Sequence, residues 1–91
     1  MSDDAIERYR QNFQDEIDSA AQYHGMAAAE PDEGVARVYI ALAVMEEKHA
    51  AFWEERLKHA DAAVPPRRPS WRARVLSWVA RRFGAQMVLP T

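Results

Sequence analysis

Residues 35–57 read VARVYIALAVMEEKHAAFWEERL, an apolar helical pattern that contains two ionisable residues on its apolar side. At about 100° per residue, Glu46 and His49 fall inside one apolar arc, whereas Glu47 falls outside it. A carboxylate and an imidazole on a core-facing stripe need partners, because burying an unpaired charge is costly. Their Glu-x-x-His spacing stacks them on adjacent turns, a spacing that metal-binding helical bundles use. The apolar members of the arc are Val35, Val38, Tyr39, Leu42, Ala43, Ala50, Trp53 and Leu57.

The composition limits the chain to a few classes of protein. Its 91 residues suggest one small domain, and 48% hydrophobic residues are enough for a core. The absence of cysteine excludes disulfides, cysteine-based zinc sites, iron–sulfur clusters and thiol catalysis, and it fits a reducing compartment. The acidic, polar start MSDDAIERYR is unlike a secretory signal, and no run of eighteen apolar residues predicts a membrane span. These features predict a cytoplasmic protein.

Charge is distributed unevenly along the chain. Residues 1–61 hold all fourteen acids and six Lys or Arg, a net charge of −8. Residues 62–91 hold six arginines and no acid, a net charge of +6. Such a split predicts two parts with different surroundings.

The acidic part predicts two long helices. The first should run from Asp3 to Ala29, because this proline-free stretch follows a capping serine and carries acids in its first turn. Glu30-Pro31 should break the chain, with a second helix starting at Pro31 or Asp32 and running to about Ala63. A loop that short predicts an antiparallel hairpin over residues 1–63.

The hairpin brings a third candidate ligand to the Glu-x-x-His pair. Glu16 lies fifteen residues before Pro31, and Glu46 lies fifteen residues after it. At roughly 1.5 Å per residue, both lie about 22 Å from the turn. We therefore expect Glu16, Glu46 and His49 to meet at one level.

The basic part predicts a linker and one shorter helix. Residues 64–69, VPPRRP, read as a stiff linker. Ser70 can cap a helix from Trp71 to Phe83, which Gly84 ends. Residues 70–91 then form a basic amphipathic helix and an apolar, membrane-proximal tail.

A second copy of the hairpin would both cover the apolar stripe and supply further ligands. One hairpin cannot cover its own apolar stripe, and it supplies only two carboxylates and one imidazole. Two hairpins related by a twofold axis form a four-helix bundle with two copies each of Glu16, Glu46 and His49, which is the ligand set of a di-iron carboxylate bundle. Mixed oxygen and imidazole ligands favour iron, or manganese, over copper(I). Glu46 would bridge the two metals, His49 and Glu16 would complete each shell, and Tyr23 and Tyr39 would hydrogen-bond the ligands.

These residues resemble the ferritin-like superfamily, most closely its rubrerythrin-type and encapsulated-ferritin branches. The resemblance rests on Glu16 followed, thirty residues later, by EEKHA with Glu46 and His49. It implies a homodimer, or a larger assembly of dimers, with two irons per dimer interface and ferroxidase activity, the oxidation of Fe(II) by dioxygen. In encapsulated ferritins further acids form the site through which iron enters, so Asp15 and Asp18 are weaker candidates, as is Glu47.

The tail carries a second resemblance, to the membrane-bound ferritins. There a rubrerythrin-like domain precedes a membrane domain of the vacuolar-iron-transporter type, and a basic, Trp-containing segment joins them, as residues 65–91 would here. This resemblance implies a place at the cytoplasmic face of the inner membrane, next to a membrane surface or a downstream transporter domain, and a role in feeding or regulating iron export.

Two alternatives stay open at this point. Glu46 and His49 can be a structural ion pair in a non-catalytic module for dimerisation and membrane docking, and His24 is more often a core histidine than a ligand. The basic helix can pack on the bundle with solvated arginines or lie in a membrane interface, where Trp and Arg suit lipid headgroups. Nucleic acid is not an expected partner, because the acidic body repels phosphates.

Overall fold

The computed structural model describes residues 2–88, and its regular structure is entirely helical. Two long helices of 27 residues each pack together, and a shorter third helix of 13 residues follows. This confirms the all-α prediction, while the last three residues of the predicted tail, 89–91, lie outside the described residues. The elements are α1 (Asp3–Ala29), α2 (Glu33–His59), α3 (Trp71–Phe83) and the 3-10 turn η1 (Ala85–Met87).

Local capping chemistry sets the helix starts. The side chains of Ser2, Asp32 and Ser70 each accept a hydrogen bond from the amide three residues further on, which satisfies one of the free N–H groups of the first turn. Gly84 ends α3 with a φ of 98°, a conformation that costs glycine little. The predicted bounds of α1 and α3 are therefore confirmed.

Both ends of α2 differ from the prediction. The helix begins at Glu33, because Asp32 caps it from outside, rather than at Pro31 or Asp32. The helix ends at His59, four residues before Ala63. Asp61 adopts a φ of 53°, its amide donates to the carbonyl of Lys58, and the next amide donates to the carbonyl of Leu57. This pair of bonds is a Schellman closure, which satisfies the last carbonyls and turns the chain back over the hairpin.

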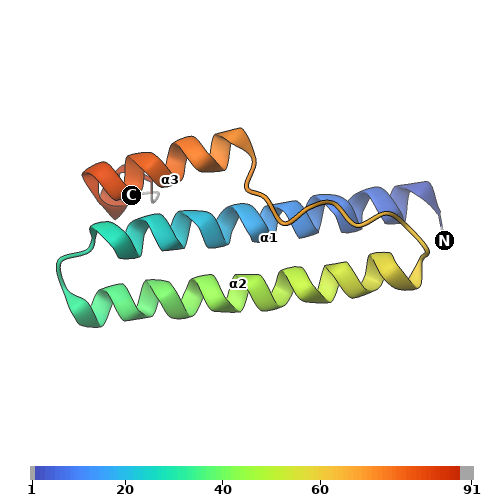
Figure 1. The fold of residues 1–91 in the computed structure, drawn as a ribbon, viewed down its shortest axis with the longest axis horizontal. Helices are drawn as coiled ribbons and strands as arrows, with labels where there is room; N and C mark the ends of the chain where they lie inside the picture. The colour runs from blue at the N-terminus through green and yellow to red at the C-terminus, as the bar shows by residue number, and fades with distance from the viewer. Residues whose placement is uncertain (1, 89–91) are drawn as a thin grey trace.

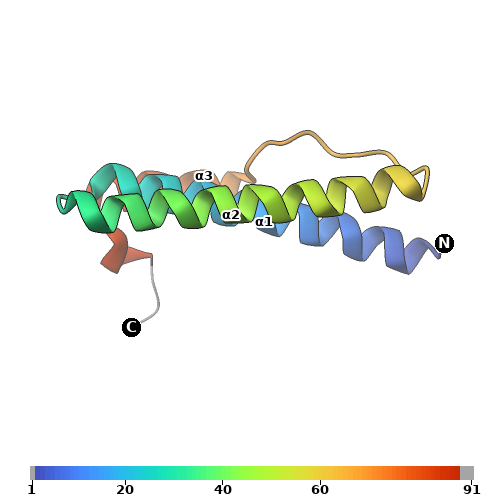
Figure 2. The same ribbon diagram turned by 90° about the horizontal axis from the view of Figure 1, so that it is seen from below.

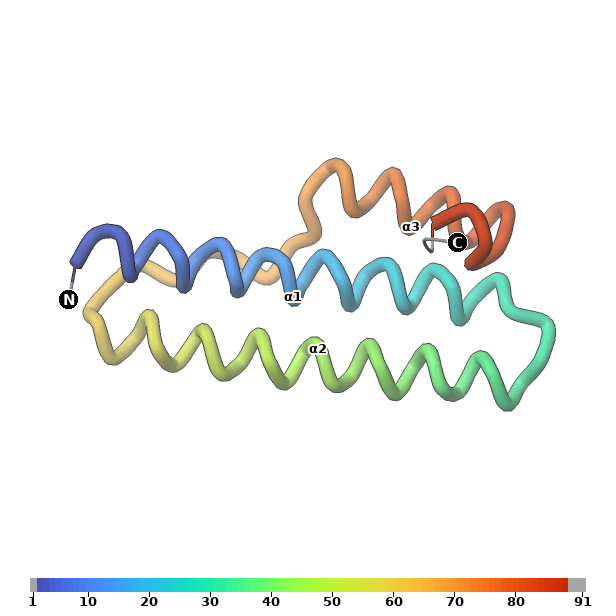
Figure 3. Tube along the Cα trace, turned by 180° about the vertical axis from the view of Figure 1, so that it is seen from behind, coloured from blue at the N-terminus to red at the C-terminus, as the bar shows by residue number. Residues whose placement is uncertain are grey.

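Helix α1 is the central element of the fold, with α2 on one side and α3 on the other (Figures 1 and 3). Phe13 of α1 and Leu57 of α2 are fully buried, and the small residues Ala43 and Ala50 let the two long helices approach closely. Tyr9 and Trp53 extend this core toward the open end of the hairpin, their ring centroids 5.6 Å apart. In residues 2–88 no helix is both long and apolar enough to cross a membrane.

The linker after α2 covers one face of the hairpin, and on the opposite face the chain covers only the end near the turn between α1 and α2, where Ala85 and Val88 pack with Tyr23 and Tyr39 (Figure 2). Figure 2 shows residues 60–69 running over one face, while the turn η1 lies on the opposite side. Arg67 holds this linker in place through two hydrogen bonds to the Glu54 carboxylate, at 3.1 and 3.2 Å. The amide and hydroxyl of Ser70 donate to Asp18 at 2.8 and 2.7 Å. We call the uncovered side of α1 and α2 the open face.

Helix α3 docks on α1 through small residues. Ala73 and Ala80 are buried, and the Ser77 hydroxyl donates to the carbonyl of Ala21 at 3.0 Å. Gly25 faces Ser77 so closely that an added Cβ would lie 2.6 Å from the Ser77 carbonyl oxygen. The absence of a side chain at Gly25 therefore sets the distance between the two helices.

Replacing Gly25→Ala is expected to displace α3. The gain in helix propensity is about 1 kcal/mol, whereas overpacking against a backbone atom costs about 1–3 kcal/mol, so the clash should dominate. Trypsin should then cleave the linker after Arg67 faster than in the unmodified chain. Gly34→Ala is the control, because an added Cβ at Gly34 would meet only a side-chain oxygen, that of Asp32, at 3.2 Å. Equal cleavage rates for the two variants would contradict this account of the packing.

Candidate metal centre

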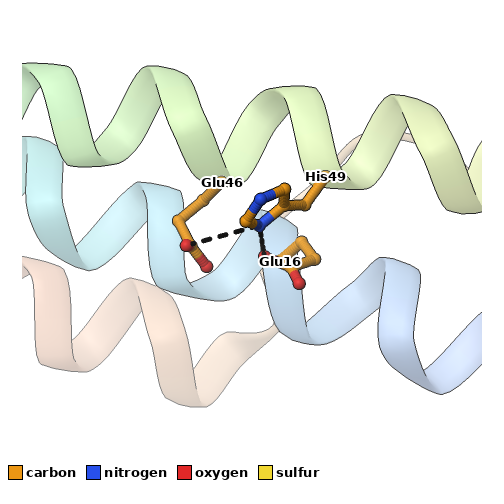
Figure 4. Close-up of side chains that lie close together, drawn as sticks. All are labelled: Glu16, Glu46 and His49. Atoms are coloured by element: carbon orange, nitrogen blue, oxygen red, sulfur yellow. Dashed lines mark ion pairs between the residues drawn. The ribbon is translucent and has the colours of Figure 1, made fainter.

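Three ionisable side chains meet at the middle of the hairpin. Glu16 is the central residue of α1 and Glu46 is the central residue of α2, each with thirteen helical residues on either side. The antiparallel pairing therefore brings them to the same level, and His49 follows one turn further along α2. Figure 4 shows the three side chains pointing toward one another from the two helices.

The distances within this group suit shared binding of a cation. Nδ1 of His49 lies 3.5 Å from Oε2 of Glu16 and 3.7 Å from Oε1 of Glu46. One donor atom from each of the three residues lies within 4.8 Å of the other two. A single ion placed among them would be in reach of two carboxylate oxygens and one imidazole nitrogen.

The burial of the group is uneven. The carboxylates of Glu16 and Glu46 are 21% and 22% exposed, whereas the His49 imidazole is 52% exposed and lies toward the open face. Oε2 of Glu16 is buried and has no hydrogen-bond partner in the described chain. An unsatisfied buried carboxylate oxygen is destabilising, and a divalent cation would satisfy it.

Glu16 affects the protonation of Glu46. A hydrogen bond to Glu16, followed by burial, raises the pKa of Glu46 from 4.5 to about 7, and the nearby His49 acts in the opposite direction. Without a cation, Glu46 therefore keeps its proton to a higher pH than a free carboxyl group does. A bound cation would displace this proton and balance both negative charges.

The donor set limits which ion would fit. Two carboxylates with one imidazole suit iron, manganese or zinc, and no soft thiolate ligand is available in the sequence to favour copper(I). One chain provides three donors, and the exposed side of His49 leaves the remaining positions on the open face. Two carboxylates and one imidazole are the same residue types as half of the ligand set of two-metal carboxylate bundles.

The weaker acidic candidates lie outside this group. Asp15 accepts a hydrogen bond from Gln11 at 2.9 Å. Asp18 accepts the bonds from Ser70 that fix the start of α3. Glu47 faces the linker side and lies 3.7 Å from Nε2 of His24.

The two tyrosines that were predicted to hydrogen-bond the ligands lie about two helical turns from Glu16 and Glu46, nearer the turn between α1 and α2. Tyr23 and Tyr39 pack against a cluster formed by Met26, Ala80 and Ala85. Among residues 2–88, neither hydroxyl forms a hydrogen bond to Glu16, Glu46 or His49. In this state of the chain they contribute packing rather than ligand orientation.

The site is bordered by an apolar stripe that the sequence arc did not include in full. Val38, Met45 and Phe52 are seven residues apart along α2, and each is at least half exposed. The seven-residue spacing places them on one side of the helix, next to His49. This spacing is the sequence signal that would have identified Met45 and Phe52 as part of the open face. We call these three residues the α2 stripe.

Comparisons with protein-family models, with curated proteins and with solved structures each find no match for this chain, so its function is argued from the chemistry of the site.

Proposed function

We propose that two copies of this chain join through their open faces and form a site that binds two Fe(II) ions and oxidises them. The observation that carries this proposal is the buried Oε2 of Glu16, which forms no hydrogen bond in the described chain and lies 3.5 Å from Nδ1 of His49, beside Glu46. These three side chains leave a cation with ligand positions unfilled on the side where a second copy would lie. An equivalent set from the partner would complete a four-carboxylate, two-histidine centre.

The position of the site along the helices supports its sharing by two copies. Because Glu16 and Glu46 are the central residues of α1 and α2, a twofold axis near them would bring the middle of one hairpin against the middle of the other. The α2 stripe would be buried in the same step. Burial of the apolar side chains of this stripe would be the main driving force for association of the two copies.

The reaction follows from the ligands. Fe(II) is the substrate, and two ions each lose one electron to a single dioxygen, which takes up two protons and leaves as hydrogen peroxide. Carboxylates stabilise Fe(III) more than Fe(II), because their charge offsets the added positive charge. Glu46 at the centre of α2 would bind both ions, while Glu16 and His49 would each bind one. Manganese fits the same ligands and is the alternative ion.

An anaerobic Fe(II) titration followed by exposure to air tests the proposal. The expected result is about one iron bound per chain and two per dimer, with rapid oxidation on adding air. His49→Ala should weaken binding at least about a hundredfold, because loss of a ligand costs more than loss of a supporting hydrogen bond. His24→Ala is the matched control, since His24 forms a similar 3.7 Å pair with Glu47 on the linker side. Equal oxidation by both variants would show that the site does not bind iron.

The structural alternative makes a different prediction for the same sample. If Glu46 and His49 only order the helices, then chelator or added iron should leave the melting temperature unchanged. A ligand that binds only the folded state raises stability, so iron-dependent stabilisation of the unmodified chain, absent in His49→Ala, supports the metal site.

We propose that this oxidation of iron precedes the export of iron across a membrane. The support is the basic, Trp-containing segment of residues 65–91 and its resemblance to the membrane-bound ferritins. In cells that carry the full-length protein, Glu46→Ala should lower iron efflux, measured as retained radioactive iron, while the amount of protein stays the same. Unchanged efflux would show that the iron site is not required for transport, and it would leave the proposed oxidation of iron unaffected.

A further inference from the structure

Helix α3 turns its largest apolar side chains away from the rest of the protein. It packs on α1 through Ala73, Ser77 and Ala80, the small side of the helix. Trp71, Val75, Trp78 and Phe83 are all more than half exposed. The ring centroids of Trp78 and Phe83 lie 6.2 Å apart in an edge-to-face arrangement. The most hydrophobic side of α3 is therefore not used by the fold, and we call these four residues the α3 outer face.

Arginines surround this face. At about 100° per residue, Arg74 and Arg81 lie along one side of the Trp71–Trp78 line and Arg72 lies along the other. Arg82 falls within the face, and its guanidinium carbon lies 5.6 Å from the Phe83 ring centroid. Long arginine side chains can keep their charge in the headgroup layer while neighbouring aromatic rings enter the layer below. Exposed tryptophans bordered by arginines are the pattern of a helix that lies flat in a membrane interface.

We propose that the α3 outer face binds the surface of a bilayer that contains anionic phospholipids, with α3 parallel to the membrane plane. Charge favours this occupant over a second α3, because two such faces would bring eight α3 arginines together. The position of α3 also suits it, since α3 lies on the flank of α1 away from α2 (Figure 1) and leaves the open face free. The proposal does not rest on the metal site.

Sedimentation with sucrose-loaded vesicles tests this surface. The full chain should bind vesicles of phosphatidylcholine mixed with phosphatidylglycerol, bind vesicles of phosphatidylcholine alone weakly, and lose affinity as salt is added. Arg81→Gln combined with Arg82→Gln should lower binding to the anionic vesicles about thirtyfold. Trp71→Ser combined with Trp78→Ser should lower binding to both vesicle types by at least about tenfold.

Two controls make the result specific to α3. Ile40→Ser combined with Val44→Ser removes exposed apolar surface from α2 and should leave vesicle binding unchanged. His49→Ala should bind vesicles as the unmodified chain does, which separates this result from failure of the iron site. Circular dichroism should show equal helix content in every variant.

A second measurement on the unmodified chain avoids any folding defect. Lipids brominated in their acyl chains should quench tryptophan fluorescence when the vesicles are anionic. Absence of both sedimentation and quenching would overturn the proposal. So would vesicle binding that the α3 substitutions do not change, or a fall in solution mass caused by the tryptophan substitutions, which would assign the α3 outer face to contact between copies.

Discussion

Replacing Glu46→Gln is expected to abolish iron binding and, at the same time, to make the metal-free protein more stable at neutral pH. The pKa of Glu46 is 4.5 in the unfolded chain and about 7 in the folded one. Between these values the folded state retains a proton that the unfolded state has lost. The free energy of unfolding therefore falls as the pH rises from about 4.5 to about 7 and is constant above that, with a total loss of about 3 kcal/mol. Glutamine keeps a donor toward Glu16 and has no proton to lose, so this penalty disappears.

Urea unfolding of chelator-treated protein at about pH 5 and about pH 8 measures the effect, at one fixed protein concentration. The unmodified chain should be less stable at the higher pH, and Glu46→Gln should remove most of that difference. Glu47→Gln changes the same charge one residue away, on the linker side, and should still bind iron. Unchanged iron affinity in the Glu46→Gln variant would contradict the cation-binding role of this carboxylate. So would a lower stability of the metal-free variant at about pH 8.

The second large effect concerns the open face. Met45→Glu is expected to leave a folded monomer that no longer oxidises iron at a measurable rate. Met45 is 50% exposed beside His49, so the substitution costs a single chain little. In the proposed dimer it would bury two like charges near the twofold axis, which should weaken association more than about a hundredfold. Loss of the partner also removes half of the ligands.

Val44→Glu is the control for this experiment. Val44 directly precedes Met45 and is 42% exposed. Because successive residues of a helix are rotated by about 100°, Val44 points away from the open face. This variant should keep the solution mass and the oxidation rate of the unmodified chain. Light scattering and iron oxidation measured on the same samples decide the outcome. A Met45→Glu variant that stays dimeric, or a monomer that oxidises iron at the normal rate, would contradict a site shared between copies.

Much of the fold could be predicted because it depends on local chemistry. Ser2, Ser70 and Gly84 act within one helical turn of themselves, so the bounds of α1 and α3 follow from neighbouring residues. The common level of Glu16 and Glu46 follows from helical rise and a short turn. The end of α2 was predicted too late, because the Schellman closure around Asp61 competes closely with continued helix and is favoured once the linker packs on the hairpin.

Three helices, their order, and two carboxylates and an imidazole at one depth of a hairpin all follow from the amino-acid sequence alone. These properties depend on caps, turns and helical periodicity, which act over a few residues. Which faces of the helices are covered depends instead on tertiary packing. Asp18 was a candidate iron ligand in the sequence, and in the fold it holds Ser70 and the start of α3. The linker covers the side of Glu47, small residues dock α3, and His49 remains on the free side. Such choices depend on contacts between different elements, such as those of Asp18 with Ser70 and of Ala21 with Ser77, and the local sequence of one helix does not determine their energies.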